Sequence, residues 1–175
     1  MVDTLAISVR RATHNDAPEL ADLVNDAYAI ERSFIDGDRT DEDEIAAMTK
    51  SGVFLVLEQA GGLAAAVYLE RRGEAAYFGM LSVRPGLQGM GLGKRLVRIA
   101  EAMAEATGAT AMTLRIINLR EELGRWYRGL GYREVGTTPY THRAQKRPCH
   151  FVDMRKELGA SPASIAGLGA SLGAA

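Results

Sequence analysis

The feature of this sequence that most constrains its fold is a glycine-rich turn followed directly by an amphipathic helix, at residues 81–108. Apolar residues recur at steps of three and four from Leu92 to Ala104, with charged residues between them, which predicts a helix that Gly108 ends. Before it, the run QGMGLG has glycine at every second position, so the backbone can turn sharply and approach a ligand closely. The first N–H groups of such a helix lack helical partners and carry partial positive charge, so the turn predicts a phosphate-binding site.

Two common nucleotide motifs do not fit this turn. The dinucleotide fingerprint G-x-G-x-x-G needs its third glycine where Lys94 or Leu96 stands. The triphosphate loop G-x-x-x-x-G-K-[ST] would have Gln88 in place of its first glycine and Arg95 in place of its Ser or Thr. A domain that binds ATP or a dinucleotide is therefore a weak alternative, which titration with ATP or NAD would test.

A third pattern fits, because Gln88, Gly91 and Gly93 form Gln-x-x-Gly-x-Gly directly after the strand-like LSVRP. On these residues the sequence resembles the GCN5-related N-acetyltransferase (GNAT) family. The family signature, [Gln/Arg]-x-x-Gly-x-[Gly/Ala], lies between the fourth strand and the third helix, where backbone amides hold the pyrophosphate of coenzyme A.

The resemblance continues downstream and covers about residues 5–158. Asn118 and the later run WYRGLGY resemble the family's Asn…Tyr…Leu-Gly-[Phe/Tyr] block. The spacing departs from the commonest family pattern, since Tyr127 follows Asn118 by nine residues rather than seven. The LGY run anchors the match of Tyr127, so the departure affects the match of Asn118.

The resemblance implies acetyl-CoA as co-substrate and a set of residues that bind it. Amides from Gly89 to Lys94 would hold the pyrophosphate, so the Gln88 side chain would be largely structural. Backbone atoms of residues 81–83 would pair with the pantetheine like an added strand, and nearby amides could form an oxyanion hole. Four cations either meet the remaining phosphate of the coenzyme or are simply solvated: Arg84, Lys94, Arg95 and Arg98. The implied cofactor-binding residues are Leu81, Ser82, Val83, Gln88, Gly89, Met90, Gly91, Leu92, Gly93, Lys94 and Asn118.

Tyr127 is the candidate catalytic residue. When an amine attacks a thioester, the departing thiolate needs a proton, and a phenol with a pKa of about 10 is still protonated at neutral pH. The family places its general acid at the residue that matches Tyr127. The structural alternative is an aromatic side chain packed in the core, and Asn118 likewise either binds the pantetheine or caps the following helix.

The sequence leaves the general base open. An acceptor lysine amine, with a pKa near 10.4, would need a base, whereas an α-amine near 7.7 to 8.0 would need little help. Glu31, Glu70, Glu74 and His142 are the candidates, beside a chain of water molecules.

Composition excludes several other classes. The chain has 175 residues, 47% hydrophobic and 25% charged, which is typical of one globular domain. The formal net charge of -1 argues against nucleic-acid binding. There is no apolar run long enough for a membrane span, and Asp3 stands where a secretory signal would be basic, so we expect a cytoplasmic protein with no membrane partner. A homodimer stays open.

Metal and thiol chemistry are not expected. His14, His142, Cys149 and His150 show no metal-ligand spacing, and adjacent residues on a strand point to opposite faces. The single cysteine, Cys149, allows no internal disulfide, and no base beside it is evident that would activate it.

The remaining pattern predicts a mixed α/β (α+β) fold. Period-2 and apolar runs predict seven strands, at 5–11, 53–57, 63–69, 75–83, 110–117, 131–136 and 150–158. Capping residues and period 3.6 predict helices at about 18–28, 40–50, 92–107 and 119–130, with Thr40 as the cap of the second and a loop at 31–39. The order β-α-α-β-β-β-α-β-α-β-β gives one sheet with helices on both faces.

Two details of the predicted sheet bear on function. Gly79 weakens its strand and could mark a bulge. The resemblance implies a mostly antiparallel sheet that carries this bulge, with a splay between its fourth and fifth strands that admits the acyl-pantetheine arm. Residues 1–158 are expected to form the single domain, and the uncharged Gly/Ala/Ser-rich segment 159–175 a disordered tail.

Together these observations favour an acetyl-CoA-dependent N-acetyltransferase that acetylates a primary amine of a small molecule or peptide in a ternary complex. The acceptor would lie between the 31–39 loop and the polar connection 137–148, whose mixed charges do not choose an acceptor. The alternative is a non-catalytic acyl-CoA sensor or regulatory protein with the same fold, which would bind the coenzyme without turnover.

Overall fold

The computed structural model describes residues 7–159, and the predicted β-α-α-β-β-β-α-β-α-β-β order is confirmed within them. Residues 5 and 6 of the first predicted strand and residues 160–175 of the predicted tail lie outside the described residues. The strands are β1 (Ser8–Arg11), β2 (Val53–Gln59), β3 (Gly62–Arg72), β4 (Ala75–Val83), β5 (Ala111–Ile117), β6 (Arg133–Pro139) and β7 (His150–Glu157). The helices are η1 (His14–Asp16), α1 (Ala17–Ala27), η2 (Ala29–Ser33), α2 (Glu42–Met48), α3 (Leu92–Ala106) and α4 (Glu121–Gly129).

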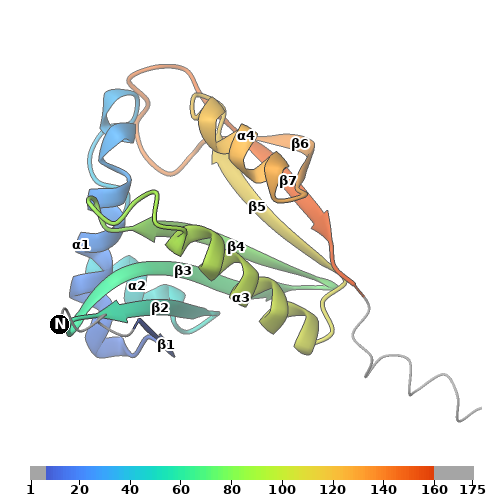
Figure 1. The fold of residues 1–175 in the computed structure, drawn as a ribbon. Helices are drawn as coiled ribbons and strands as arrows, with labels where there is room; N and C mark the ends of the chain where they lie inside the picture. Colours follow the sequence, from blue (N-terminus) through green and yellow to red (C-terminus); the bar gives the residue numbers. More distant parts are fainter. Residues whose placement is uncertain (1–6, 160–175) are drawn as a thin grey trace, which may run out of the picture.

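The strands form one seven-stranded sheet in the order β1-β2-β3-β4-β5-β7-β6. Every neighbouring pair is antiparallel except β4 and β5, which run parallel because the chain crosses over through α3 between them. The first four strands and the last three form two halves that meet at one end and separate toward the other (Figure 1).

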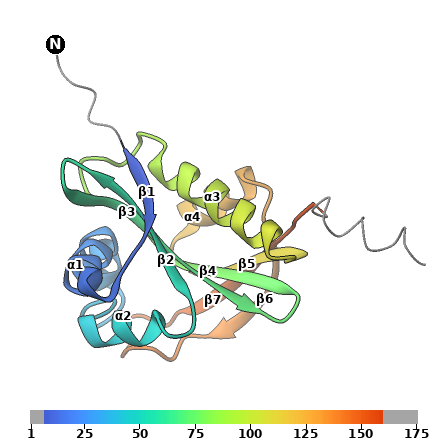
Figure 2. The same cartoon turned by 90° about the horizontal axis from the view of Figure 1, so that it is seen from below.

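Alternation along the strands builds a core on each face of the sheet. Leu55 and Leu57 of β2 point to the face that α3 and α4 cover, whereas Phe54 and Val56 point to the face that α1 and α2 cover. Figure 2 shows the two pairs of helices on opposite sides of the strands. The predicted arrangement of helices on both faces is therefore confirmed.

The bulge predicted at Gly79 is present in β4, but the strained residue is its neighbour. The register with β3 shifts between the pairs Tyr68↔Gly79 and Ala66↔Ser82, so one extra residue lies on β4. Met80 takes the left-handed conformation there, with φ of 50°. A non-glycine residue rarely adopts this region, so the surrounding β3 and helix packing must hold Met80 in it.

The splay between β4 and β5 follows from how short their pairing is. Only Ala75 to Tyr77 of β4 pair with β5, at Ala111 to Thr113. Beyond Tyr77 the two strands diverge, and the second half of β4 and the end of β5 leave a wedge between them (Figure 1). This wedge positions the candidate site.

Three local predictions need correction. The predicted loop 31–39 begins inside η2. Asp41, not Thr40, caps α2, because its carboxylate accepts from the Glu44 N–H at 2.8 Å. The last predicted polar connection starts later than expected, because β6 runs on to Pro139 beside β7.

The loop after η2 and the connection between β6 and β7 are fastened together at the wide end of the wedge. Ile35 and Gln145 form an isolated antiparallel bridge, and the Asp36 N–H donates to the Ala144 carbonyl at 2.9 Å. These segments lie side by side at the top of Figure 1. The wedge is thereby bridged at its wide end.

Candidate active site

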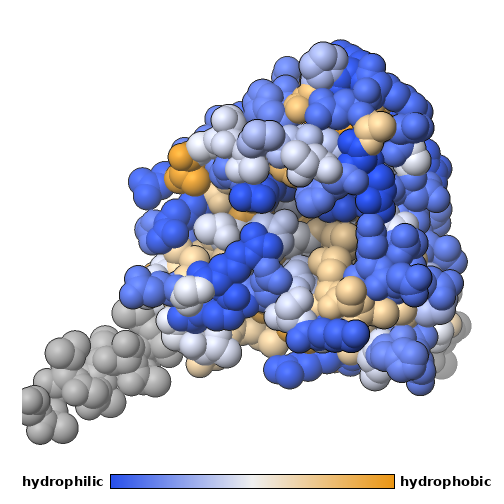
Figure 3. Space-filling view, turned by 180° about the vertical axis from the view of Figure 1, so that it is seen from behind, coloured by the Kyte–Doolittle hydropathy of each residue, from blue (hydrophilic) through white to orange (hydrophobic). Residues whose placement is uncertain are grey.

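A cavity of about 1040 Å³ fills the wedge between β4 and β5. One end is lined by the glycine turn, and the other by η2, the loop before α2 and the connection after β6. The space-filling view from behind shows a hollow in the middle of the molecule, where pale and tan side chains lie between blue hydrophilic ones (Figure 3). The cavity therefore joins the predicted phosphate site to the predicted acceptor side.

The glycine turn presents an open backbone surface. Gly89 and Gly91 have φ of 80° and 82°, and a β-carbon added at either would have no atom within 4 Å. Gly91 caps α3, and the Arg95 N–H donates to its carbonyl at 3.0 Å. Within residues 7–159 the N–H groups of Leu92, Gly93 and Lys94 have no acceptor, so they are free for an anion.

The Gln88 side chain connects the glycine turn to the end of β4. Its amide Nε2 donates to the Val83 carbonyl at 3.3 Å, which ties the turn to the end of β4. That the Gln88 side chain is largely structural stays a prediction. Ten of the eleven residues of the predicted cofactor set lie around the turn and the end of β4, and eight of them line the cavity: Leu81, Val83, Gln88, Gly89, Gly91, Leu92, Gly93 and Lys94.

The other three predicted cofactor residues, Ser82, Met90 and Asn118, do not line the cavity. Ser82 is buried, and its hydroxyl donates to the Met80 carbonyl at 3.0 Å. Met90 is 64% exposed beside the turn. The Asn118 side-chain oxygen accepts from the His150 N–H at 2.9 Å, which fastens the end of β5 to β7 outside the cavity lining. The side chain of Asn118 thus has a structural task, and its role toward pantetheine stays a prediction.

Tyr127 lies in the cavity wall within an aromatic cluster. It is 5% exposed, and its ring centroid lies 5.9 Å from Phe78, 4.8 Å from Trp126 and 5.8 Å from Tyr132. Burial raises the pKa of the Tyr127 phenol well above its usual value. Within residues 7–159 no group hydrogen-bonds its hydroxyl, yet that oxygen is not among fully buried unpaired atoms, so it opens onto the cavity.

Three of the four candidate bases line the cavity, and two of these are held by arginine. The buried Glu31 accepts from Arg120 at 3.1 Å, and desolvation raises the pKa of its carboxyl against the effect of that arginine. Glu70 accepts from the Tyr68 hydroxyl at 2.6 Å and from Arg72. Glu74 lies in the turn between β3 and β4, outside the cavity lining.

His142 is the third, and its ring has no ion-pair partner among residues 7–159. Partial burial and the nearby guanidinium groups of Arg39 and Arg143 lower its pKa below its usual value of 6.5. The imidazole is therefore mainly neutral at pH 7 and can accept a proton.

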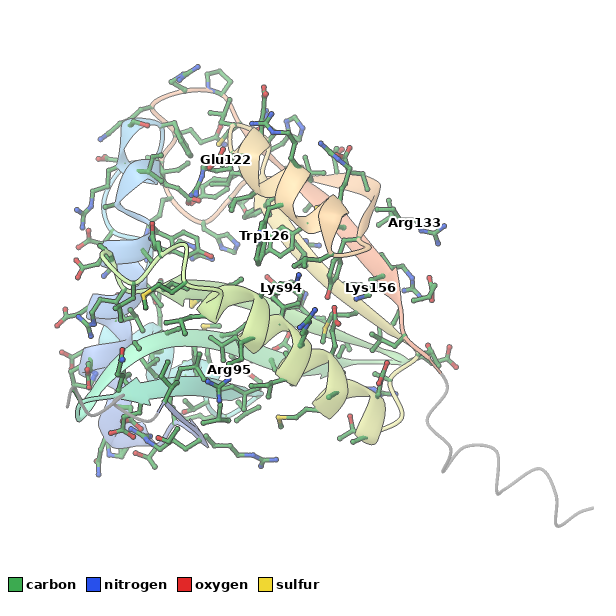
Figure 4. The ribbon with its side chains drawn as sticks, in the orientation of Figure 1. Lys94, Arg95, Glu122, Trp126, Arg133 and Lys156 are labelled. Carbon is green, nitrogen blue, oxygen red and sulfur yellow. The ribbon has the colours of Figure 1, made fainter. Side chains whose placement is uncertain are left out.

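Several cavity residues were missed by the sequence patterns. Tyr28 and Tyr77 have phenol groups at the wedge, and burial raises the pKa of both. In the sequence, Tyr28 continues the apolar spacing of the helix predicted at 18–28, and no local pattern marks Tyr77 on a strand. Trp126 points from α4 toward Lys94 on α3 across the gap between these helices (Figure 4). Only tertiary structure brings these side chains together.

The cations near the turn differ in their surroundings. Arg84 donates to the Leu63 carbonyl at 2.9 Å, and the Glu19 carboxylate lies 3.5 Å from its guanidinium. Arg84 is not part of the cavity lining. Lys94 lines the main cavity. Lys94 and Arg98 also line a second cavity of about 200 Å³ between α3 and α4.

Neither metal binding nor thiol chemistry is supported by the described residues. Residues 7–159 contain no group of three or more His, Cys, Asp or Glu side chains that could hold a metal ion. Burial raises the pKa of the Cys149 thiol, which disfavours the thiolate. No helix in the described part of the chain is both long and apolar enough to span a membrane.

Comparisons with known proteins support the family and the fold. A family model described as an acetyltransferase (GNAT) domain matches residues 26–158. The comparison with curated protein sequences gave no match. The ribosomal-protein-S18-alanine N-acetyltransferase of Escherichia coli has a similar structure, with a TM-score of 0.71 and 18% identity over 89% of this chain and 96% of that one.

Two other solved structures are similar to the same extent. The IAA acetyltransferase of Bacillus cereus ATCC 14579 has a TM-score of 0.66 and 19% identity, over 87% of this chain and 100% of that one. The Salmonella typhimurium protein yncA, in a structure with its cofactor acetyl-CoA, has a TM-score of 0.69 and 21% identity over 90% and 98%. At these identities the likeness shows a shared fold.

Proposed function

Because the chain belongs to the GNAT acetyltransferase family, we propose that it is an acetyl-CoA-dependent N-acetyltransferase acting on a primary amine of a small molecule or peptide. One observation carries this proposal. The open glycine turn at the start of α3 and the Tyr127 hydroxyl line the same cavity, so a phosphate site and a proton donor share one space. A nucleotide-binding domain would need only the first of these.

The turn fits a pyrophosphate. Two glycines with positive φ leave its outer surface open, and three N–H groups without a partner in the described part of the chain follow at the start of a 15-residue helix. Backbone amides at a helix start bind phosphate oxygens directly, and the helix dipole adds to the attraction. Lys94 and Arg98, at the second cavity beside α3, would meet the coenzyme's remaining phosphate.

The wedge fits an extended arm. Beyond Tyr77, β4 has no partner strand on its β5 side, so its backbone groups can pair with the amides of a pantetheine. The bulge at Met80 lies along this free edge and turns the strand's backbone. Acetyl-CoA would supply an acetyl group activated as a thioester, whose transfer to an amine forms an amide and releases a thiol.

Two side chains would handle the protons of that transfer. Tyr127 would donate its phenol proton to the departing sulfur. Because the pKa of the phenol is raised, this proton is present at all physiological pH values. His142, neutral at pH 7, would accept the proton that the amine loses as its nitrogen bonds to the acetyl carbon. The neighbours' names, a ribosomal-protein alanine in one case and IAA in another, do not choose between peptide and small-molecule acceptors.

Isothermal titration with acetyl-CoA, beside desulfo-CoA and ATP, tests the cofactor. We expect binding of acetyl-CoA and desulfo-CoA but not ATP, and loss of binding in Gly91→Glu, whose carboxylate would occupy the open turn. Free-thiol release in the presence of an amine panel then tests the reaction. Tight binding of ATP without acetyl-CoA would overturn the proposal, and binding of acetyl-CoA with no thiol release for any amine would favour a non-catalytic sensor.

A further inference from the structure

Most charged side chains that line the cavity form ion pairs with other residues of the protein. Four carboxylates line it, and each is already paired with an arginine of the protein. The pairs are Glu31 with Arg120 at 3.1 Å, Glu44 with Arg143 at 2.7 Å, Glu122 with Arg120 at 2.5 Å, and Glu70 with Arg72. Arg115, which also lines the cavity, is paired with Asp153 at 2.7 Å.

Two lining cations remain without a carboxylate among residues 7–159, Lys94 and Arg39. Lys94 lies in the first turn of α3, next to the glycine turn, where the phosphates of the coenzyme account for it under the proposed function. Arg39 lies at the opposite side, in the loop before α2, and makes no hydrogen bond or ion pair within the described residues. Among the described residues, Arg39 is therefore the cation on the acceptor side of the cavity that makes no direct ion pair with a carboxylate.

The side chain of Arg39 lies against the cavity and does not extend freely into solvent. Arg39 is half-buried, and its guanidinium carbon lies 5.7 Å from the centroid of the Tyr28 ring. Its charge acts on the pKa of Tyr28, Tyr77 and His142, three groups on different walls of the cavity. It also lowers the pKa of the buried Glu31, whose direct hydrogen bond is with Arg120. The guanidinium thus faces the space that a substrate would enter.

The backbone next to Arg39 is held on both sides. Asn25 of α1 clamps the following residue, Thr40, because its Nδ2 donates to the Thr40 carbonyl at 2.9 Å and its Oδ1 accepts from the Thr40 N–H at 3.0 Å. Asp41 then caps α2, and Arg143 reaches the Asp38 carbonyl at 3.3 Å. A fixed stem reduces the entropy lost when the guanidinium binds a ligand.

We infer that Arg39 binds an oxyanion carried by the acceptor, so that the substrate class is an amine that also bears a carboxylate or a comparable oxyanion, as in amino acids. A guanidinium offers two parallel donors that match a carboxylate or phosphonate and is always charged at neutral pH. The carboxylates of the cavity are held by three other arginines, with Glu31 and Glu122 sharing Arg120, and none of them lies within 4 Å of the Arg39 guanidinium. This inference rests on the proposed function, because it names the acceptor of that transferase.

The kinetic test compares amines that differ only in the oxyanion. Alanine, glutamate, phenylalanine and lysine are assayed by thiol release against their carboxamides, and aminophosphonates of the same side chains distinguish the two kinds of oxyanion. We expect the acid of the true acceptor to be favoured over its amide, and Arg39→Gln to lower kcat/KM for the acid by about 10- to 100-fold, mainly through KM. Arg32→Gln is the matched control, because Arg32 in η2 is exposed, pairs with Asp38 at 2.7 Å and lies outside the cavity lining.

A binding test makes the inference independent of turnover. The side-chain N–H signal of Arg39, assigned by its loss in Arg39→Gln, is followed by NMR while the protein amino acids, their amides and the aminophosphonates are added to about 10 mM. We expect at least one acid to shift this signal and its amide to leave it unchanged. No shift with any acid, or equal shifts with acid and amide, would overturn the inference.

The two tests separate the two proposals. Thiol release with equal rates for acids and amides, and no change in Arg39→Gln, would leave the transferase and overturn the role of Arg39. A shift of the Arg39 signal by an acid, with no thiol release and no binding of acetyl-CoA, would leave the oxyanion site and overturn the transferase.

Discussion

The carboxylate of Glu31 accepts a hydrogen bond from the guanidinium of Arg120 at 3.1 Å, although 89 residues separate them in the chain. Glu31 belongs to η2, and Arg120 precedes α4, so this pair joins the two halves of the molecule across the wide end of the wedge. Both side chains are largely buried, at 8% and 13% exposure. The pair therefore holds the cavity in shape as well as lining it.

Removing one member of this pair should destabilise the fold far more than removing both. Arg120→Met leaves a buried carboxylate unpaired, and we expect a loss of about 3 kcal/mol in the free energy of unfolding, measured with urea. Glu31→Leu combined with Arg120→Met leaves no buried charge unpaired, since Glu122, the other partner of Arg120, is 52% exposed, so most of the loss should be recovered. A double variant as unstable as the single one would contradict this account.

The same variant should show a definite pH dependence. Burial raises the pKa of Glu31, so its charged form is the disfavoured one in the folded state, and Arg120 opposes that effect. Without Arg120 the pKa rises further. A carboxyl whose pKa is raised on folding contributes stability below its unfolded pKa and loses it as pH rises through the folded pKa. The stability deficit of Arg120→Met should therefore shrink as pH is lowered from 7 through the folded pKa, as urea unfolding at several pH values would show.

Alanine should have opposite consequences at two neighbouring glycines. Gly91 has φ of 82° and open space around its missing β-carbon, so Gly91→Ala costs conformational strain of about 1 to 2 kcal/mol without any clash. Gly93 lies inside α3 with ordinary contacts of 3.7 to 3.9 Å, so Gly93→Ala should be neutral or slightly stabilising. Thermal unfolding of the two variants measures the difference. Equal effects would mean that the conformation of the turn does not set the cost.

Tyr127→Phe should separate chemistry from packing. The Tyr127 hydroxyl has no hydrogen-bond partner in residues 7–159, so its removal should leave stability and acetyl-CoA affinity nearly unchanged. If it is the proton donor, kcat should fall by about 10²- to 10⁴-fold.

Tyr132→Phe is the matched control in the same aromatic cluster. The Tyr132 hydroxyl donates to Glu101 at 2.7 Å, so this variant should lose about 1 kcal/mol of stability and little of its rate. Urea unfolding measures the stability of both variants, and thiol-release assays measure their rates. Full turnover in Tyr127→Phe would reduce Tyr127 to a packing residue.

The parts of the fold that could be predicted are those set by local period and turn chemistry. The bounds of β4, from Ala75 to Val83, follow from an apolar run between an Arg-Arg-Gly-Glu turn and Pro85. The start of α3 follows from its glycines and amphipathic face. Even the bulge had a local signal in Gly79, although the positive φ fell on Met80, whose conformation depends on its pairing with β3.

The acceptor side could not be predicted in the same way. Arg39 looked like one charge in a polar loop, and Tyr28 like one position of an apolar helix face. Their common surroundings exist because the Ile35 and Gln145 segments pair across 110 residues of chain, and because Arg143 and Arg120 already occupy the nearby carboxylates. Which cation remains unpaired depends on all of these contacts at once, and no local pattern records it.

His142 supplies a final prediction, because its titration reports on the charge that Arg39 places in the cavity. Partial burial lowers the pKa of His142 below 6.5, and the positive charges of Arg39 and then Arg143 lower it further. Removing Arg39 takes away a charge that disfavours the imidazolium, so Arg39→Gln should raise the pKa of His142, whereas Arg32→Gln should not change it. The measurement is an NMR titration of the His142 ring protons in the wild-type protein and the two variants.

If His142 is also the base, the acidic limb of the kcat/KM profile should move to higher pH together with this pKa in Arg39→Gln. A limb that stays in place while the NMR pKa moves would assign the base to another group, and an unmoved NMR pKa would mean that Arg39 does not face the histidine across the cavity.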